Sequence, residues 1–318
     1  MRIANNMMSD RLLANLQRSY SRMATTQEQI STGRRVNRPS DDPTAAGAER
    51  LRTGELEGIK RSQDSVSAAT GWLTASESAV ASVGDVVSRA RDLALQGANA
   101  GTDQNGRNLI AGEIDQLIKA AKDAVNVKYG DAYIFSGTRS DVPPYAPATA
   151  DAYQGDTGAV IREAGPGASL QVNAPFVPVG ASPAGTTQPL TGLSLLGAGS
   201  AAGDGRVLDA LEQLATHLRG GTTADLQAIQ TTDLQALDAN QRAVSDARGA
   251  IGATMNRAAA AMSRLESLQD LTTKGIDDLT GVDLAKALID FTAQQSAYQA
   301  ALKVGAQIIQ PSLVDFLR

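Results

Sequence analysis

Charged side chains of both signs gather in one short loop near the N-terminus. Arg34, Arg35 and Arg38 stand beside Asp41 and Asp42. Clustered guanidinium groups could bind an anion through their paired N–H donors. A loop that carries both signs more often pairs with itself or with a neighbouring subunit, so both interpretations stay open. The two aspartates lack the further ligands that a metal ion needs, and we expect no metal site there.

Residues for catalysis are scarce. His217 is the single histidine and the chain has no cysteine, which excludes disulfides and thiolate chemistry and disfavours a zinc site. A Ser-His hydrolase is an alternative, but His217 lies on a leucine-rich helical segment and no Gly-x-Ser-x-Gly turn occurs. Gly155, Gly158, Gly165 and Gly167 lack the lysine-serine pair and the following helix of a phosphate loop. We expect neither an enzyme nor a bound cofactor.

The net charge and the hydropathy of the chain argue against nucleic acid and membrane as partners. A net charge of -5 gives no general attraction to nucleic acid. No run approaches the ~20 apolar residues of a membrane span, and the first residues lack the apolar core of a signal peptide. Sequence physics alone therefore predicts a cytoplasmic protein, and export would need a route without a cleaved leader.

The two ends of the chain carry matching apolar stripes. Residues 282–318 and residues 9–32 each read as one helix, because large side chains recur at intervals of three and four. Neither helix alone buries enough apolar surface to offset its ordering, so each needs a partner. The side chains expected at the resulting interface are Leu13, Leu16, Tyr20, Met23, Ile30, Leu284, Leu288, Phe291, Tyr298, Leu302 and Ile309.

Long helical rods follow each end inward. Apolar residues recur every seven positions within 43–100 and again within 223–274, which is the spacing of coiled coils. Shorter helices are expected around 110–125 and from about 205. The repeating positions are Ile59, Val66, Leu73, Val80, Val87 and Ala94 in the first rod, and Leu237, Val244, Ile251, Ala258 and Leu265 in the second.

A proline-rich segment interrupts the rods. Eight of the eleven prolines lie between Pro143 and Pro189, which excludes long helices there. Residues 159–163 and 169–177 are β-prone, and 131–138 reads as a strand or a hairpin arm. We predict a mainly α protein of three parts: a terminal coiled-coil domain of 1–40 with 275–318, a rod of 41–140 with 204–274, and a β-rich surface insertion of 141–203.

This layout resembles bacterial flagellins and their relatives. The run STGRRVNRPSDDPTAAG at 31–47 looks like the N-terminal signature of that family, and 282–318 is similar to its C-terminal helix. Residues 1–3, 38–43 and 130–145 point to those members that join the flagellar hook to the filament. The ending DFLR leans toward a filament-forming flagellin, which is the alternative. The signature loop contains Arg35, Asn37, Pro39, Ser40, Asp41 and Asp42.

The resemblance also implies partners and a location. It implies export through the flagellar type III apparatus, a cytoplasmic export chaperone, and assembly outside the cell as a homo-oligomeric ring. The neighbours in that setting would be hook-associated protein 1 and filament flagellin. Terminal helices that are too poor in apolar surface to fold alone would be disordered before assembly and helical after it.

Overall fold

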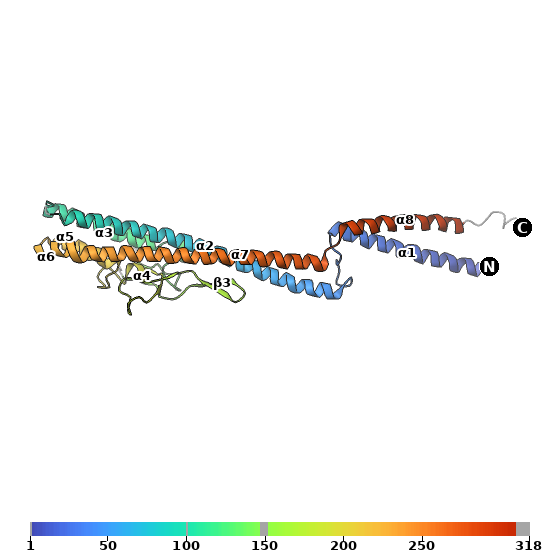
Figure 1. Ribbon diagram of the computed structural model, residues 1–318, viewed down its shortest axis with the longest axis horizontal. Coiled ribbons are helices and arrows are strands. Elements are labelled where there is room, and N and C mark those ends of the chain that lie inside the picture. The colour runs from blue at the N-terminus through green and yellow to red at the C-terminus, as the bar shows by residue number, and fades with distance from the viewer. Residues whose placement is uncertain (1, 100, 147–151, 310–318) are drawn as a thin grey trace. The chain divides into compact units, whose positions relative to one another are not determined.

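The computed structural model describes residues 2–99, 101–146 and 152–309, and most of them are helical (Figure 1). The chain divides into two compact units, a terminal unit of Met1–Gly58 with Leu268–Arg318 and a central unit of Ile59–Ser267. The prediction of a mainly α fold with long helices and a small β-rich insertion is confirmed. The three-part division of the chain stays a prediction.

Long helices account for both units. Most helix limits lie close to the predicted ones, but the N-terminal helix begins at Arg2 and not at residue 9. The last rod, predicted for 223–274, contains a π-helical turn and ends at Thr280. In chain order the helices are α1 (Arg2–Thr32), α2 (Pro43–Gly97), α3 (Gln104–Val125), α4 (Gly192–Leu196), α5 (Val207–Gly220), α6 (Thr223–Ala228), the π-helical turn η1 (Ile229–Asp233), α7 (Leu234–Thr280) and α8 (Leu284–Ile309).

Side-chain caps explain several of these limits. Asp103 accepts a hydrogen bond from the Gly106 amide at 2.8 Å and begins α3. Thr222 begins α6, and it exchanges hydrogen bonds with Asp225 in a capping box. Gly221 ends α5 with a φ of +64°, a conformation that glycine adopts at little cost. Residues next to each of these helix ends therefore determine where the helix begins or stops.

The core of the central unit follows the seven-residue repeat. Every repeating position predicted for the two rods is buried, from Ile59 to Ala94 and from Leu237 to Leu265. α2 and α7 pack closely enough that a Cβ added at Gly84 would lie 3.2 Å from Cγ1 of Val244. Ion pairs flank this core, with 2.7 Å between Arg91 Nε and Asp238 Oδ1 and 2.7 Å between Arg248 Nη2 and Glu77 Oε1.

The β-rich insertion contains two small antiparallel strand pairs. β3 (Ile161–Gly165) pairs with β4 (Ala168–Gln171), where the sequence predicts β-prone pieces. β5 (Pro175–Phe176) pairs with β6 (Gln188–Pro189). Tyr145 is buried beside them, and its hydroxyl lies 2.9 Å from the carbonyl oxygen of Gly192 and 2.5 Å from that of Gly197.

The segment 131–138 is more irregular than a strand arm. β1 (Lys128–Tyr129) pairs with β2 (Ala132–Tyr133), and each has two residues. Beyond β2 the Ile134 amide donates to the carbonyl of Val127, next to β1, but the Tyr133 amide donates away from the pair, to Ser140. Among the residues that the structure describes, none of the helices combines the length and the hydrophobicity that spanning a bilayer requires.

Candidate assembly surface

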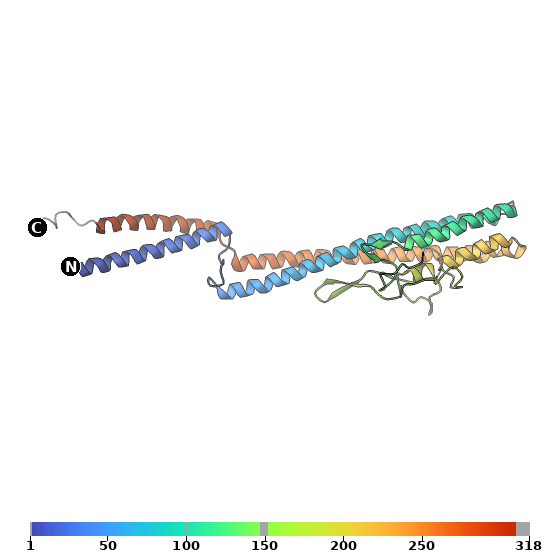
Figure 2. The ribbon, with the colours of Figure 1, turned by 180° about the vertical axis from the view of Figure 1, so that it is seen from behind.

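The two terminal helices lie side by side and antiparallel within the terminal unit (Figures 1 and 2). Backbone hydrogen bonds link the segment that follows α1 to the segment that precedes α8. The Arg35 amide donates to the Thr280 carbonyl at 2.6 Å, and the Val282 amide donates to the Gly33 carbonyl at 3.1 Å. Asp283 then caps α8 by accepting from the Lys286 amide at 3.1 Å. These bonds set the point from which α1 and α8 extend together.

Small and polar side chains, together with a tyrosine pair and Leu12, form the seam between α1 and α8. Thr26 Oγ1 donates a hydrogen bond to Gln294 Oε1 at 3.3 Å. The Tyr20 and Tyr298 rings meet with their centroids 6.2 Å apart. A Cβ added at Gly305 would lie 2.8 Å from Cδ2 of Leu12, so the helices approach closely at that point. The seam therefore leaves much of the large apolar surface uncovered.

An apolar groove of about 430 Å³ runs along this helix pair, lined by Leu13, Leu16, Gln17, Tyr20, Tyr298 and Leu302. Leu13 and Tyr20 are each 59% exposed, and Leu302 is 45% exposed. Leu288 is 51% exposed, farther along α8. Half-exposed leucines in a row are unusual on a monomer surface, and such a patch marks an interaction site.

The structure brings most of the predicted interface residues to this helix pair. Leu16, Met23, Ile30, Phe291 and Tyr298 are partly covered, and Leu284 is exposed like Leu288. The side chain of Ile309 lies outside the part of the structure that is described. Membership of an interface between subunits stays a prediction for all of these residues.

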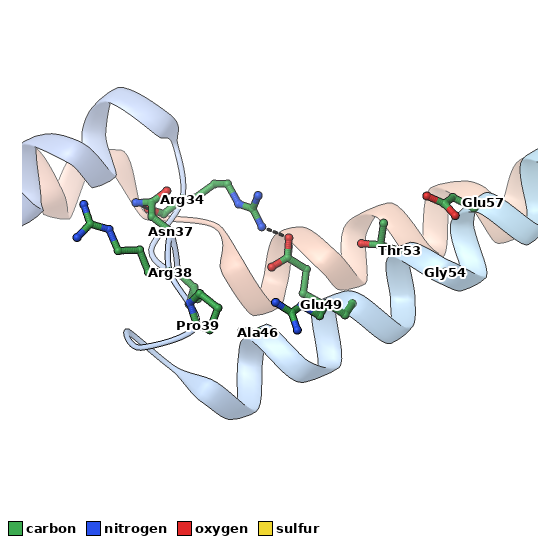
Figure 3. Close-up of a pocket in the computed structure, with 11 residues that line it drawn as sticks. Arg34, Asn37, Arg38, Pro39, Ala46, Glu49, Thr53, Gly54 and Glu57 are labelled. Atoms are coloured by element: carbon green, nitrogen blue, oxygen red, sulfur yellow. Dashed lines mark hydrogen bonds and ion pairs between the residues drawn. The ribbon is translucent and has the colours of Figure 1, made fainter.

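The charged loop after α1 is occupied by its own ion pairs. The Arg34 guanidinium pairs with the Glu49 carboxylate (Figure 3). Arg35 lies 3.3 Å from Asp42, and Arg38 lies 3.5 Å from Glu28. All three arginines of the sequence cluster thus have a carboxylate partner in the same chain. This arrangement favours a self-paired loop over a site for a free anion.

The two aspartates of the loop hold backbone in place. Asp41 accepts from the amides of Asn37 and Arg38, at 3.1 and 2.8 Å. Asp42 accepts from the Ala45 amide at 3.0 Å at the start of α2. The bond from the Ala45 amide is the largest cause that lowers the pKa of Asp42, and hydrogen bonds from the side chains of Thr44 and Arg35 lower it further, to about 2. Both carboxylates act as structural acceptors. Pro39 and Ser40, which precede the two aspartates, are exposed.

A cavity of about 400 Å³ lies between this loop and α2 (Figure 3). Arg34, Arg38 and Arg50 line it together with Glu49 and Glu57. Because the walls carry both charge signs, the cavity offers no single charge to a ligand. No group of three or more potential metal-ligating residues occurs among the residues that the structure describes.

Sequence reasoning missed the seam itself. It followed the large side chains, whereas Ala287 and Gly305 are buried and Thr26 and Gln294 are bonded to each other. A signal was present, since Ala287, Gln294 and Ala301 recur at seven-residue intervals, as do Leu12, Ser19 and Thr26. The small members of these two sets, such as Ala287, Ala301 and Ser19, allow the helices to approach closely.

Comparison with known families matches both ends of the chain. The bacterial flagellin N-terminal helical region matches residues 3–140, and the bacterial flagellin C-terminal helical region matches residues 234–317. These matches cover α1, α2 and α3 on one side and α7 and α8 on the other. Together they span more than half of the sequence.

Individual relatives match over nearly their whole length. Flagellin of Bacillus subtilis is 24% identical over 98% of this chain and 97% of its own. Flagellar hook-associated protein 3 of Escherichia coli is 22% identical, over 95% of each chain. Among solved structures, hook-associated protein 3 of Legionella pneumophila is similar with a TM-score of 0.57 and 15% identity, covering 72% of this chain and 98% of that one. At that identity the structural likeness shows a shared fold.

Proposed function

This chain belongs to the bacterial flagellin family, and from that premise we propose that it is the structural protein that joins the flagellar hook to the filament. The observation that carries the proposal is the apolar groove on the α1–α8 pair, which no part of the described chain covers. The likeness to hook-associated protein 3 along the whole chain supports the junction role, as do the motifs at 38–43 and 130–145.

The energetics of the helix pair explain why assembly would need neighbours. Full burial of a leucine contributes ~1.5 to 3 kcal/mol, so a half-exposed leucine has about 1 kcal/mol still to gain. Leu13, Leu288 and Leu302 are in this state. Neighbouring copies that cover the groove supply this burial, and the terminal helices become fully stable only in the assembled ring.

The proposed partners follow from the same surface. Copies of this chain cover the groove within a ring, and hook-associated protein 1 and filament flagellin adjoin the ring on its two sides. Before export through the flagellar type III apparatus, a cytoplasmic chaperone binds an exposed apolar face of the terminal segments, most simply α8. The role is structural and involves no catalysis.

Substitutions of exposed leucines on α8, inside the groove at Leu302 and beyond it at Leu288, test the interface. Leu288→Asp or Leu302→Asp places a carboxylate where a neighbour should bury it, which costs several kcal/mol without a partner. We expect the central unit to stay folded while incorporation into flagella is lost. Ser296→Asp is the matched control, because Ser296 is exposed on another face of α8 and does not line the groove. Normal incorporation of both leucine variants would refute the interface.

A filament-forming flagellin is the second candidate, favoured by the full-length likeness to the flagellin of Bacillus subtilis. Loss of the gene separates the two roles. Without a junction protein, hooks form and filament subunits leak into the medium. Without the filament protein, no such subunits are released. Seeded polymerisation of the purified chain gives a second answer, since a junction protein does not grow long filaments by itself.

A further inference from the structure

A second groove lies on the central unit, away from the terminal helices. It has a volume of about 390 Å³ and runs between the β3–β4 hairpin and α7, which lie next to each other in Figure 1. Its floor consists of small or apolar side chains, and two arginines of α7 complete it. The lining includes Ala164, Leu170, Ala260, Ala261, Arg257 and Arg264.

The walls of this groove are fixed by packing. Leu170 of β4 and Leu265 of α7 are both buried. Gly165 stands close to α7, because a Cβ added there would lie 3.3 Å from Cδ2 of Leu265. Gly165 has a φ of +130°, which other residues rarely adopt, so the hairpin turns toward the helix at this residue. The groove is therefore preformed.

Arg257 and Arg264 give the groove a positive charge. They lie seven residues apart, which is about 10.5 Å along a helix. Both are exposed, and neither forms a hydrogen bond or an ion pair with any residue that the structure describes. No carboxylate lines the groove. A partner that fits it presents two carboxylates at the same spacing over a surface of small side chains.

The chain itself carries such a surface on α2. Asp85 and Asp92 are exposed and also seven residues apart, with Ser88 and Arg89 between them on the same face of the helix. Neither carboxylate is hydrogen-bonded or ion-paired to another described residue. Arg91, the charge nearest to Asp92, is already paired with Asp238. Arg89 is paired with Glu113 at 2.6 Å.

Other carboxylate pairs at this spacing fit the groove less well. Glu57 and Asp64 have Lys60 and Arg61 between them on the same helix face. Asp270 and Asp277 have Lys274 between them. These cations would repel the two arginines of the groove. Arg89 lies at the corresponding position between Asp85 and Asp92, but it is already paired with Glu113. The face formed by Asp85, Ser88 and Asp92 therefore complements the groove better by charge than these two pairs do.

The two surfaces cannot meet within one chain. Asp85 follows Gly84, which packs against Val244 of α7. Arg257 lies 13 residues farther along that helix, a distance of about 20 Å. We propose that the groove at Arg257 and Arg264 of one copy binds the Asp85–Asp92 face of α2 of a second copy.

This contact would join two different surfaces of the same chain. Such heterologous contacts generate rings or helical arrays, whereas a surface that pairs with itself gives closed dimers. The inference rests on the proposed function only in its premise that copies assemble. It adds a second contact, in the central unit, to the apolar contact of the terminal helices.

Cysteine cross-linking tests the contact directly, because the full chain has no cysteine of its own. Ala260→Cys places a thiol in the groove and Ser88→Cys places one on the α2 face. We expect a mixture of the two full-length variants to form a mixed disulfide dimer at least about fivefold more than either variant alone. Ala259→Cys, exposed on the same helix but outside the groove, is the control for Ala260→Cys.

Charge reversal tests the proposed pairing. Arg257→Asp with Arg264→Asp, or Asp85→Arg with Asp92→Arg, should each reduce the mixed dimer at least about fivefold. A chain with reversed arginines mixed with a chain with reversed aspartates should restore it. Arg162→Asp with Arg242→Asp changes the net charge equally at exposed sites outside the groove and should have no effect.

Two results would overturn the inference. One is a mixture of Ala260→Cys and Ser88→Cys that cross-links no more than the Ala259→Cys control. The other is a charge reversal that has no effect or is not rescued by its complement. Incorporation of the unmodified chain into flagella is scored separately. Normal incorporation without the cross-link refutes this contact alone, whereas a cross-link without incorporation supports the contact and refutes the junction role.

Discussion

Thr26 and Gln294 are 268 positions apart in the chain, yet the Thr26 hydroxyl donates to the Gln294 side-chain oxygen at 3.3 Å. The same register brings Tyr20 to Tyr298 and Leu12 to Gly305. α1 and α8 are thus aligned over most of their length by small and polar groups. Their large apolar side chains remain available to neighbouring copies.

The helices of this seam approach closely at Gly305, so we predict that a larger side chain there disrupts the helix pair. Gly305→Leu should force α1 and α8 apart, because even a Cβ there would lie 2.8 Å from Leu12 Cδ2. We expect incorporation into flagella to fall strongly. Leu12→Ala in the same chain should restore part of it by making room. Ala300→Leu, on an exposed face of α8, should incorporate normally. Equal behaviour of the variants at 300 and 305 would contradict the seam.

A hydrogen bond between His217 and the buried Asp233 in the central unit predicts a stability effect at His217. Nδ1 of His217 lies 2.7 Å from Oδ2 of Asp233, whose side chain is 1% exposed. The other oxygen of Asp233 has no hydrogen-bond partner among the described residues. His217→Ala should lower the free energy of unfolding by ~1 to 3 kcal/mol, the cost of a buried polar group without a partner. Denaturant unfolding followed by the fluorescence of Trp72, the single tryptophan, measures it.

The pH dependence of the same variant gives a second check. Burial raises the pKa of Asp233, and His217 opposes that shift. Without His217 this pKa should rise further. A carboxyl with a raised folded-state pKa binds its proton more tightly in the folded chain, so stability is gained as pH falls through that pKa. The deficit of His217→Ala should therefore shrink toward acid pH. A deficit that grows on acidification would contradict this account.

Burial of Tyr145 predicts an effect in the β-rich insertion. Its hydroxyl is shared between the carbonyl oxygens of Gly192 and Gly197, and burial raises its pKa well above the ordinary value. Tyr145→Phe should destabilise the central unit by ~1 to 3 kcal/mol, because the Gly197 carbonyl loses this donor and the Gly192 carbonyl keeps only the Gly197 amide. Hydrogen exchange should quicken around α4. Tyr133→Phe is the control, since its ring lies below Lys128 and is only partly buried.

The seven-residue repeats made the rods predictable, because burial along a long helix pair depends mainly on spacing. Positions such as Leu73 and Ile251 are fully buried, as their spacing indicates. The predicted start of the first rod at residue 43 matches the start of α2 at Pro43. The same local rules predicted that the proline-rich segment has only short strands.

Pairings between distant residues could not be read in this way. Nothing near His217 in the sequence indicates that Asp233 lies beside it, because that contact depends on the π-helical turn Ile229–Asp233. Glu49 as the partner of Arg34 depends on the path of the loop between α1 and α2. The charged loop left two interpretations open for this reason, and its geometry favours self-pairing.

Acid titration of Asp42 predicts when the start of α2 loses its cap. Oδ1 of Asp42 accepts from the Ala45 amide at 3.0 Å and from the Thr44 hydroxyl at 2.7 Å, which lowers its pKa from an ordinary 3.8 to about 2. A carboxyl with a lowered folded-state pKa stabilises the fold above its unfolded pKa, and this contribution is lost as pH falls from there through about 2. Unfolding midpoints between about pH 5 and 2 should therefore fall more in the wild type than in Asp42→Asn, which keeps an acceptor but has no charge to lose. A carboxyl titration of Asp42 by NMR with its midpoint at the ordinary value would show that the cap is not formed in solution.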